Sequence, residues 1–207
     1  MAKLYFRYGA MNSGKTTSLL QTAYNYEERG QKVLIIKASV DTKGQDTVVS
    51  RLGMSRPVDL LVSGTEDLRA LVRHRVLGQR ARDPEAALRQ GVDCILVDEA
   101  QFLTSRQVNQ LMELVLLDDV PVLAYGIRTD FRTVSFPGSR RLLEIAHSLE
   151  ELKTICRCGR KAVFTARKQG KAFVFDGDQV AIDGDAITYE SLCGTCYLQA
   201  GGVLSDQ

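Results

Sequence analysis

The chain has 207 residues, so it exceeds one typical domain of roughly 150 residues, and its 44% hydrophobic content is enough for a buried core. Its formal net charge of +2 gives no general case for a nucleic-acid partner. No apolar run approaches the roughly 20 residues that cross a bilayer, and residues 1–4 open a strand rather than a signal peptide, so we expect a cytoplasmic protein without a membrane partner.

The first elements are a strand over Lys3–Tyr8 and a helix over Thr16–Glu28, joined by a glycine-rich loop. The loop has the pattern G-x-x-x-x-G-K-[ST], whose glycines let backbone N–H groups turn toward phosphate oxygens beside a helix N-terminus. We expect Lys15 to reach the outer phosphates of ATP, and the Thr16 hydroxyl to hold Mg²⁺. The predicted phosphate-binding residues are Gly9, Ala10, Met11, Asn12, Ser13, Gly14, Lys15 and Thr16.

The segment that follows is less regular. An apolar run over Lys32–Lys37 predicts a strand covered on both faces, and Val40–Pro57, with its glycines and weak periodicity, predicts a mobile loop. The capping-box spacing of Ser63 and Glu66 introduces a helix through residue 75. A cap residue before proline predicts a short helix over residues 83–91.

The next strand, Cys94–Asp98, is apolar and ends in an acid that is followed by Glu99. Four further elements complete the predicted core: a helix capped at Thr104 and running to Leu117, a strand over Pro121–Tyr125 broken by Gly126, a helix over Ser139–His147 after a loop, and a last strand over Leu152–Ile155. Because strands alternate with helices, we predict an α/β fold of the P-loop (RecA-like) class, with a mostly parallel sheet covered by helices on both faces. The phosphate loop and Asp98 then share the carboxyl edge of the sheet, where ligands bind.

Asp98 and Glu99 are expected to have different tasks, since adjacent strand residues point to opposite faces. We assign Asp98 to Mg²⁺ and Glu99 to proton chemistry. In a kinase, Glu99 takes a proton from a substrate hydroxyl; in an ATPase it polarises water, and the string Asp98-Glu-Ala-Gln101 does resemble the second motif of helicases. Helicases normally place two such domains in one chain, and roughly 150 core residues supply one, so the kinase hypothesis leads.

Two cysteine pairs, C-x-C and C-x-x-C, supply enough thiolates for a closed tetrahedral zinc site with a structural role. They bracket a segment of alternating pattern, with strands over Ala162–Arg167 and Ala172–Phe175 and a long loop over Asp176–Ala186. We therefore divide the chain into a nucleotide-binding domain, residues 1–153, and a small zinc-ribbon-like β module, residues 154–207. The predicted zinc ligands are Cys156, Cys158, Cys193 and Cys196, whereas Cys94 is expected to pack in the core.

Basic residues gather between Leu152 and Phe175 without an intervening acid. Such a run is usually a solvated face; if one of its members contacts phosphate, Arg167 is the first candidate. Zinc ribbons also bind nucleic acid, so this segment supports a third hypothesis, in which the chain is a nucleic-acid-binding module rather than an enzyme.

Four segments of the chain together resemble those of a known protein family. The chain resembles the thymidine kinases of the zinc-containing cellular type (type II), and the bacterial members most of all, over nearly its whole length. The likeness rests on Gly9–Thr16, Asp98–Leu103, Tyr125–Phe131 and Tyr189–Cys193.

This resemblance implies transfer of the ATP γ-phosphoryl group to the 5′-hydroxyl of thymidine, and of deoxyuridine, in nucleotide salvage. It implies that Glu99 is the general base, that Asp98 is the Mg²⁺-associated acid, and that Asp98 and Gln101 belong to the ATP site. A lasso loop from about Lys171 to Ile187, tied by zinc, is expected to fold over the nucleoside. The implied nucleoside-binding residues are Met11, Phe102, Ile127, Phe131, Phe136 and Tyr189.

The chain departs from the family pattern in the segment over residues 40–57. Lys43 stands where many members have an arginine, and Ser50-Arg51 where many have a histidine, so phosphate contacts from Lys43 or Arg51 stay open. The resemblance also implies a homotetramer that binds ATP and thymidine and no nucleic acid.

Overall fold

The computed structural model describes residues 1–39, 46–82, 87–179 and 187–204. Its largest element is a six-stranded sheet of order β5-β2-β6-β7-β1-β8, in which all neighbouring strands are parallel. The predicted α/β class is therefore confirmed. In chain order these strands are β1 (Leu4–Gly9), β2 (Val33–Ala38), β5 (Leu60–Val62), β6 (Cys94–Asp98), β7 (Val122–Ile127) and β8 (Ser148–Glu151).

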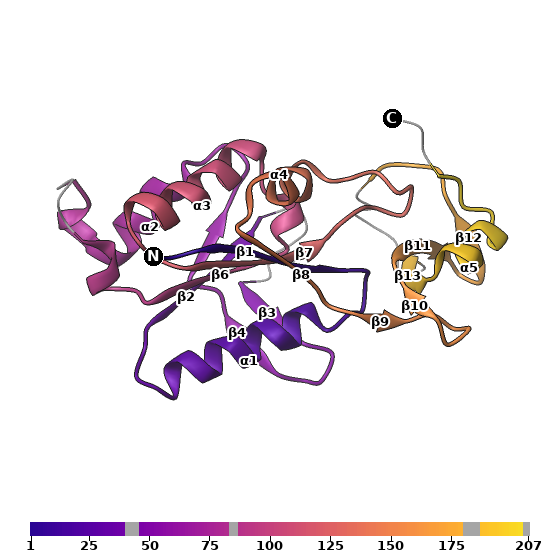
Figure 1. Ribbon diagram of the computed structural model, residues 1–207, viewed down its shortest axis with the longest axis horizontal. Coiled ribbons are helices and arrows are strands. Elements are labelled where there is room, and N and C mark those ends of the chain that lie inside the picture. The colour runs from indigo at the N-terminus through magenta and orange to yellow at the C-terminus, as the bar shows by residue number, and fades with distance from the viewer. Residues whose placement is uncertain (40–45, 83–86, 180–186, 205–207) are drawn as a thin grey trace.

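Helices cover both faces of the sheet, as Figure 1 shows with α1 on one side and α2, α3 and α4 on the other. Strand β6 explains this arrangement, since its residues alternate between two cores: Ile95 and Val97 pack with α2 and α3, whereas Cys94 and Leu96 pack with α1. The helices are α1 (Lys15–Glu27), α2 (Leu68–Leu77), α3 (Ser105–Leu117) and α4 (Pro137–Ile145), with short 3₁₀ turns η1 (Gly78–Arg82), η2 (Leu88–Gln90) and η3 (Ala100–Phe102).

The segment predicted as a mobile loop, Val40–Pro57, contains a hairpin, so that prediction was wrong for its described part, residues 46–57. Strands β3 (Thr47–Val49) and β4 (Ser55–Pro57) pair antiparallel. Val48 is 1% exposed and packs in the core beside α1. Three-residue strands are too short for a period of two to stand out in the sequence.

Several predicted boundaries also need correction. The structure adds the edge strand β5, and α2 begins only after Asp67, whose carboxylate accepts from Ala70 N–H; Ser63 is therefore not its cap. The predicted cap at residues 83 and 84 lies outside the described residues, although a 3₁₀ turn, η2, does precede Gly91. The predicted capping box at Thr104 is confirmed.

The end of the core differs from the prediction in three ways. Strand β7 continues through Gly126 to Ile127. The glycine is needed there because an added Cβ would lie 2.9 Å from Gln101 Oε1. Helix α4 begins two residues early, at Pro137, where proline suits a first helical position. The last strand of the core sheet is β8, and Thr154–Ile155 forms a separate strand, β9, beyond it.

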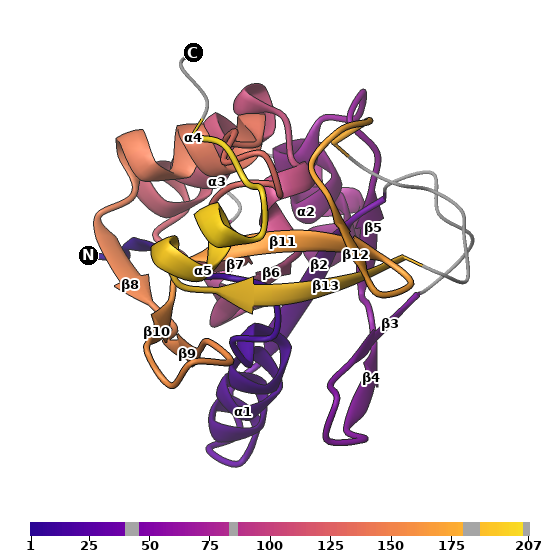
Figure 2. The ribbon, with the colours of Figure 1, turned by 90° about the vertical axis from the view of Figure 1, so that its right-hand side faces the viewer.

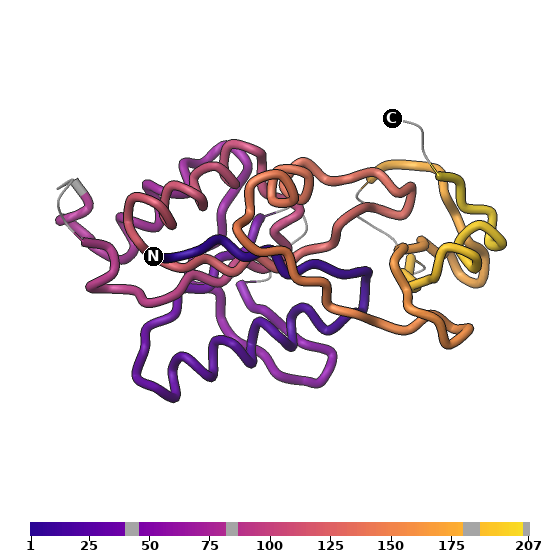
Figure 3. The backbone as a smooth tube through the Cα atoms, in the orientation of Figure 1, coloured from indigo at the N-terminus to yellow at the C-terminus, as the bar shows by residue number. Residues whose placement is uncertain are grey.

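Beyond β8 the chain forms a smaller part, called here the C-terminal module (residues 154–204, without 180–186). Figure 2 shows its strands β11 and β13 lying side by side across the end of the core, and the backbone trace of Figure 3 shows the single connection that leads from β8 into it. Its core includes Ala166, Leu192 and Tyr197. Its elements are β9 (Thr154–Ile155), β10 (Lys161–Ala162), β11 (Phe164–Gln169), β12 (Ala172–Val174), β13 (Ile187–Leu192) and α5 (Gly194–Gln199).

Among the helices of the described residues, none combines the length and apolar character needed to cross a membrane.

Candidate active site

The glycine-rich loop lies where β1 passes into α1, as the sequence predicts. Asn12 and Gly14 both have left-handed backbone conformations, with φ of 63° and 78°. Gly9 is packed so closely that an added Cβ would lie 2.6 Å from the Leu152 carbonyl oxygen, which explains why this position needs glycine. The loop thus has the tight, strained course of a phosphate cradle.

Lys15 turns back over this loop, with its Nζ donating to the Ala10 carbonyl oxygen at 2.8 Å. Burial lowers the pKa of Lys15 to about 8, while the charges of Glu99 and Asp98 raise it and that of Arg51 lowers it. A buried ammonium at this place is stabilised by an anion, because phosphate oxygens replace the water it has lost. The charged groups of Asp98 and Glu99 therefore lie close enough to Lys15 to shift its pKa.

Asp98 is 5% exposed and ends β6 on the face that α1 covers. The pKa of Asp98 is raised to about 7, first by burial and then by the charge of Glu99, while a backbone hydrogen bond from Glu99 and the charges of Lys37 and Lys15 act to lower it. A divalent cation beside this carboxylate would favour its ionised form. The residue therefore fits the predicted association with Mg²⁺.

Glu99 has left the strand. Its φ and ψ are 50° and 40°, a left-handed conformation that is uncommon outside glycine, asparagine and aspartate. Strand alternation therefore no longer dictates where its carboxylate points. Gln101 holds that carboxylate, since its Nε2 donates to Glu99 Oε2 and its Oε1 accepts from Ile127 N–H at 3.2 Å. Gln101, predicted for the ATP site, thus links Glu99 to the end of β7.

The four predicted zinc ligands come together. The Sγ atoms of Cys156, Cys158, Cys193 and Cys196 all lie within 4.8 Å of one another, and the Sγ atoms of Cys158 and Cys193 are 3.6 Å apart. Zn–S bonds of about 2.3 Å in a tetrahedron place sulfurs roughly 3.8 Å apart. The cluster therefore has the dimensions of a four-thiolate zinc site.

The contacts between described residues join most of the predicted nucleoside-binding residues into two separate groups. Phe102 and Phe136 meet edge to face with ring centroids 5.5 Å apart, and Ile127 is joined to this pair through Gln101 and η3. Phe131 and Tyr189 form a second group, since both rings lie near one shared cation. Asn12 connects the phosphate loop to this group, because its Nδ2 donates to the Tyr189 carbonyl oxygen at 3.4 Å, whereas the hydrogen bonds of Met11 are to Thr165 and Ser191.

The shared cation is Arg167, the first candidate for a phosphate contact among the basic residues between Leu152 and Phe175. It is 5% exposed and not part of a solvated face, and its guanidinium lies 3.7 Å from the Phe131 ring centroid. It donates to the carbonyl oxygens of Asp178 and Gln179, at 2.7 and 3.3 Å. Arg167 therefore connects Phe131, in the segment between β7 and α4, to the predicted lasso. Lys43, by contrast, lies outside the described residues.

Sequence reasoning missed two residues of the site. Thr165 and Ser191 are buried in the C-terminal module, and their hydroxyl groups bond to the backbone of Met11. Threonine and serine in a strand carry no distinctive pattern, and 154 and 180 residues separate them from Met11. No signal in the sequence pairs them.

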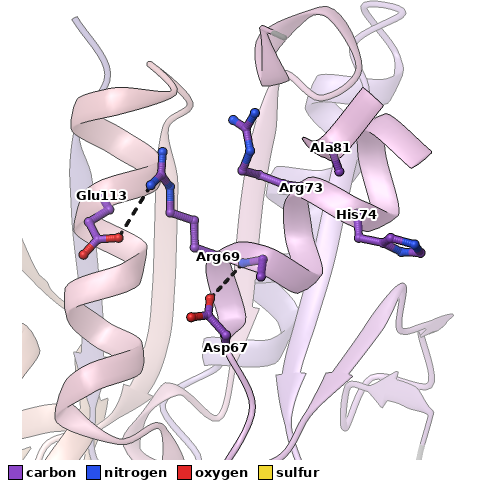
Figure 4. Close-up of a pocket in the computed structure, with 7 residues that line it drawn as sticks. Asp67, Arg69, Arg73, His74, Ala81 and Glu113 are labelled. Atoms are coloured by element: carbon purple, nitrogen blue, oxygen red, sulfur yellow. Dashed lines mark hydrogen bonds and ion pairs between the residues drawn. The ribbon is translucent and has the colours of Figure 1, made fainter. Parts of the chain in front are cut away.

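The structure also has a hollow of about 440 Å³ on another side of the core (Figure 4). Its lining comes from α2, η1 and α3 and contains no predicted site residue. Two of its arginines, Arg69 and Arg73, already pair with Asp118. We assign this hollow no part in the site. Its lining residues are Asp67, Arg69, Ala70, Arg73, His74, Ala81 and Glu113.

Comparison with known proteins connects this geometry to a family. The family model described as thymidine kinase matches residues 2–197. The thymidine kinase of Idiomarina loihiensis is 47% identical over 206 residues, which cover 98% of this chain and 100% of that protein. The thymidine kinases of Photorhabdus laumondii and Yersinia pseudotuberculosis are 45% and 46% identical, each over 97% of this chain and over 94% and 96% of their own lengths.

Two solved structures are much more distant. A Pif1 helicase from Candida albicans matches 75% of this chain and 37% of its own, with a TM-score of 0.42 and 15% identity. A DNA replication initiation factor matches 73% of this chain and 40% of its own, with a TM-score of 0.39 and 18% identity. Likeness at this level carries no indication of a shared activity.

Proposed function

The chain belongs to the thymidine kinase family, and we propose that it transfers the γ-phosphoryl group of ATP to the 5′-hydroxyl of thymidine. The observation that carries this proposal is the convergence of three residues at one edge of the sheet: Lys15, whose pKa burial lowers, the buried Asp98, and Glu99, whose backbone has left the strand. The first two suit a nucleotide with its cation, and the third suits an acceptor hydroxyl.

In this proposal the loop Gly9–Thr16 holds the phosphates of ATP, and Lys15 neutralises the outer ones. Mg²⁺, held by Asp98 and the Thr16 hydroxyl, supplies charge neutralisation of the phosphates. The burial of the Lys15 ammonium supports this arrangement, because a desolvated cation acts strongly on developing negative charge.

Glu99 is proposed as the general base. It takes the proton of the 5′-hydroxyl while the 5′-oxygen forms its bond to the γ-phosphorus, and the bond from that phosphorus to the β–γ bridging oxygen breaks. ADP leaves with that oxygen, and thymidine monophosphate keeps the phosphoryl group. Gln101 supports this role as a positioning residue, since its bond fixes one carboxylate oxygen of Glu99.

The nucleoside is proposed to bind between Met11, Phe102, Ile127, Phe131 and Phe136, below the loop that Tyr189 and the cysteine cluster flank. Apolar and aromatic walls suit a base ring, and a closed loop excludes the water that would otherwise accept the phosphoryl group. The cysteine cluster is closed, so zinc there is assigned a structural role, to tie the base of the loop.

Further expectations belong to the same proposal. We expect deoxyuridine to be accepted as well, the enzyme to act in the cytoplasm in nucleotide salvage, and the chain to assemble as a homotetramer. We also propose to keep the division into residues 1–153 and 154–207, because the chain enters the C-terminal module once, after β8 (Figure 3).

Phosphate transfer from γ-labelled ATP, with and without thymidine, tests the proposal. Labelled thymidine monophosphate that forms only when the nucleoside is present is the expected result. Release of inorganic phosphate alone, at a rate raised by nucleic acid and not by thymidine, would instead favour an ATPase.

A further inference from the structure

The C-terminal module holds Met11 of the phosphate loop through both of the peptide groups that flank this residue. The Met11 N–H donates to Thr165 Oγ1 at 3.1 Å, and the Met11 carbonyl oxygen accepts from Ser191 Oγ. Thr165 and Ser191 are directly opposite each other on the paired strands β11 and β13, which Figure 2 shows side by side. The two hydroxyls therefore project from the same face of the sheet as a matched pair.

Both hydroxyl groups of this pair are shielded from water. Thr165 and Ser191 are 4% and 7% exposed, so water competes little for their hydroxyl groups. The next residue of the loop, Asn12, has a left-handed conformation that costs free energy. It too contacts the module, since Asn12 Nδ2 donates to the Tyr189 carbonyl oxygen and its own carbonyl oxygen accepts from Thr154 Oγ1 at 3.5 Å. Four hydrogen bonds thus tie two loop residues to the module.

The direction of these bonds matters for the ligand. A phosphate cradle acts through backbone N–H groups aimed at oxygens, and rotation of one peptide moves the N–H groups beside it. The Met11 N–H and the Met11 carbonyl belong to two successive peptide groups, so the two bonds restrict the rotation of both groups before ATP arrives. A pre-organised loop binds more tightly, since less conformational freedom is lost on binding.

We propose that Thr165 and Ser191 are positioning residues for the phosphate loop, so that affinity for the triphosphate of ATP depends on the C-terminal module. The inference rests on the proposed function only in taking ATP as the ligand of this loop. It connects the module to the nucleotide site in addition to the nucleoside site.

Direct titration of the full-length, zinc-loaded chain with Mg·ATP tests this inference without any turnover. Thr165→Val and Ser191→Ala are each expected to weaken ATP binding about tenfold, the cost of roughly one hydrogen bond in a buried site. Thr165→Ser keeps the hydroxyl and is expected to bind as wild type does. Thr188→Ala, an exposed change on the same strand as Ser191, is the matched control.

Steady-state kinetics separates positioning from general damage. For Ser191→Ala the KM for ATP is expected to rise about tenfold, while the KM for thymidine changes less than about threefold. Zinc content and the circular dichroism spectrum report whether a variant is folded; if Ser191→Ala fails that check, the comparison of Thr165→Val with Thr165→Ser decides. ATP binding within twofold of wild type in folded Thr165→Val would overturn the inference. A wild type that binds ATP and leaves thymidine unphosphorylated would refute the proposed function instead.

Discussion

The carboxyl edge of the core sheet and the C-terminal module hold their residues by different means. Asp98 ends a strand whose residues are all buried, and it lies between helices packed on both faces. The module has a small apolar core, so its shape depends more on cross-links: the cysteine cluster, the Arg167 contacts and the bonds to Met11. Small units with little buried surface generally need such additions.

This difference has a functional consequence. Changes at the core edge are expected to lower kcat with the fold intact, because burial of the sheet keeps the geometry. Changes in the module are expected to raise KM, because the cross-links determine whether binding surfaces stay in place. Each of the following experiments tests one side of that contrast.

The largest effect is expected at the core edge. Glu99→Gln removes the carboxylate proposed to take the proton but keeps a similar shape, so kcat should fall on the order of 10² or more with ATP affinity retained. Phosphate-transfer assays and ATP titration measure the two quantities. Glu113→Gln, on the exposed face of α3, is the control. Turnover near that of wild type in Glu99→Gln would remove this residue from its role.

Removal of zinc is the strongest test of the module. Metal analysis should return about one zinc per chain, and chelation should raise the KM for thymidine by tens of fold, since a misplacement of about 1 Å at a site can cost 10²-fold. Hydrogen exchange should become faster in β11 and β13, while β6 and β7 stay protected. Uniformly faster exchange in both regions would contradict the contrast between them.

Arg167 tests a smaller cross-link. Arg167→Lys keeps the charge but loses the planar guanidinium, whose Nη2 donates to Asp178 and Gln179 and whose plane lies over the Phe131 ring. The KM for thymidine is expected to rise about tenfold with kcat changed less than threefold. Lys168→Met, the half-buried neighbour on β11, is the matched control. A fall in kcat with KM unchanged would place Arg167 with the chemistry instead.

The smallest effect is expected at Gln101. Gln101→Leu removes the bond to Glu99 and leaves the general base in place, so kcat should fall about fivefold, equivalent to roughly 1 kcal/mol. The kcat of Gln31→Leu, an exposed change after α1, should equal that of wild type. In the double variant Glu99→Gln, Gln101→Leu, the second change should add nothing, because there is no carboxylate left to position. Additive losses would show a separate role for Gln101.

Much of the core and its chemical groups could be predicted from the sequence because the relevant signals are local. The loop Gly9–Thr16, the strand ending at Asp98 and the capping box at Thr104 are each short segments whose residue types restrict the backbone directly. The two cysteine pairs are equally readable, since metal ligands come in few types and spacings. These features determined the α/β class, the glycine-rich loop between β1 and α1, and the thiolate cluster.

Only the tertiary structure decided how the two regions are joined. The left-handed turn that frees Glu99 from strand alternation, the stacking of Arg167 on Phe131 and the pairing of Thr165 and Ser191 on Met11 follow from packing across long stretches of chain. Serine, threonine and arginine serve equally well on solvated faces, so their residue type does not reveal a buried partner. Local sequence restricts local backbone, but contacts between distant residues are chosen by the way that all the elements bury their apolar faces together.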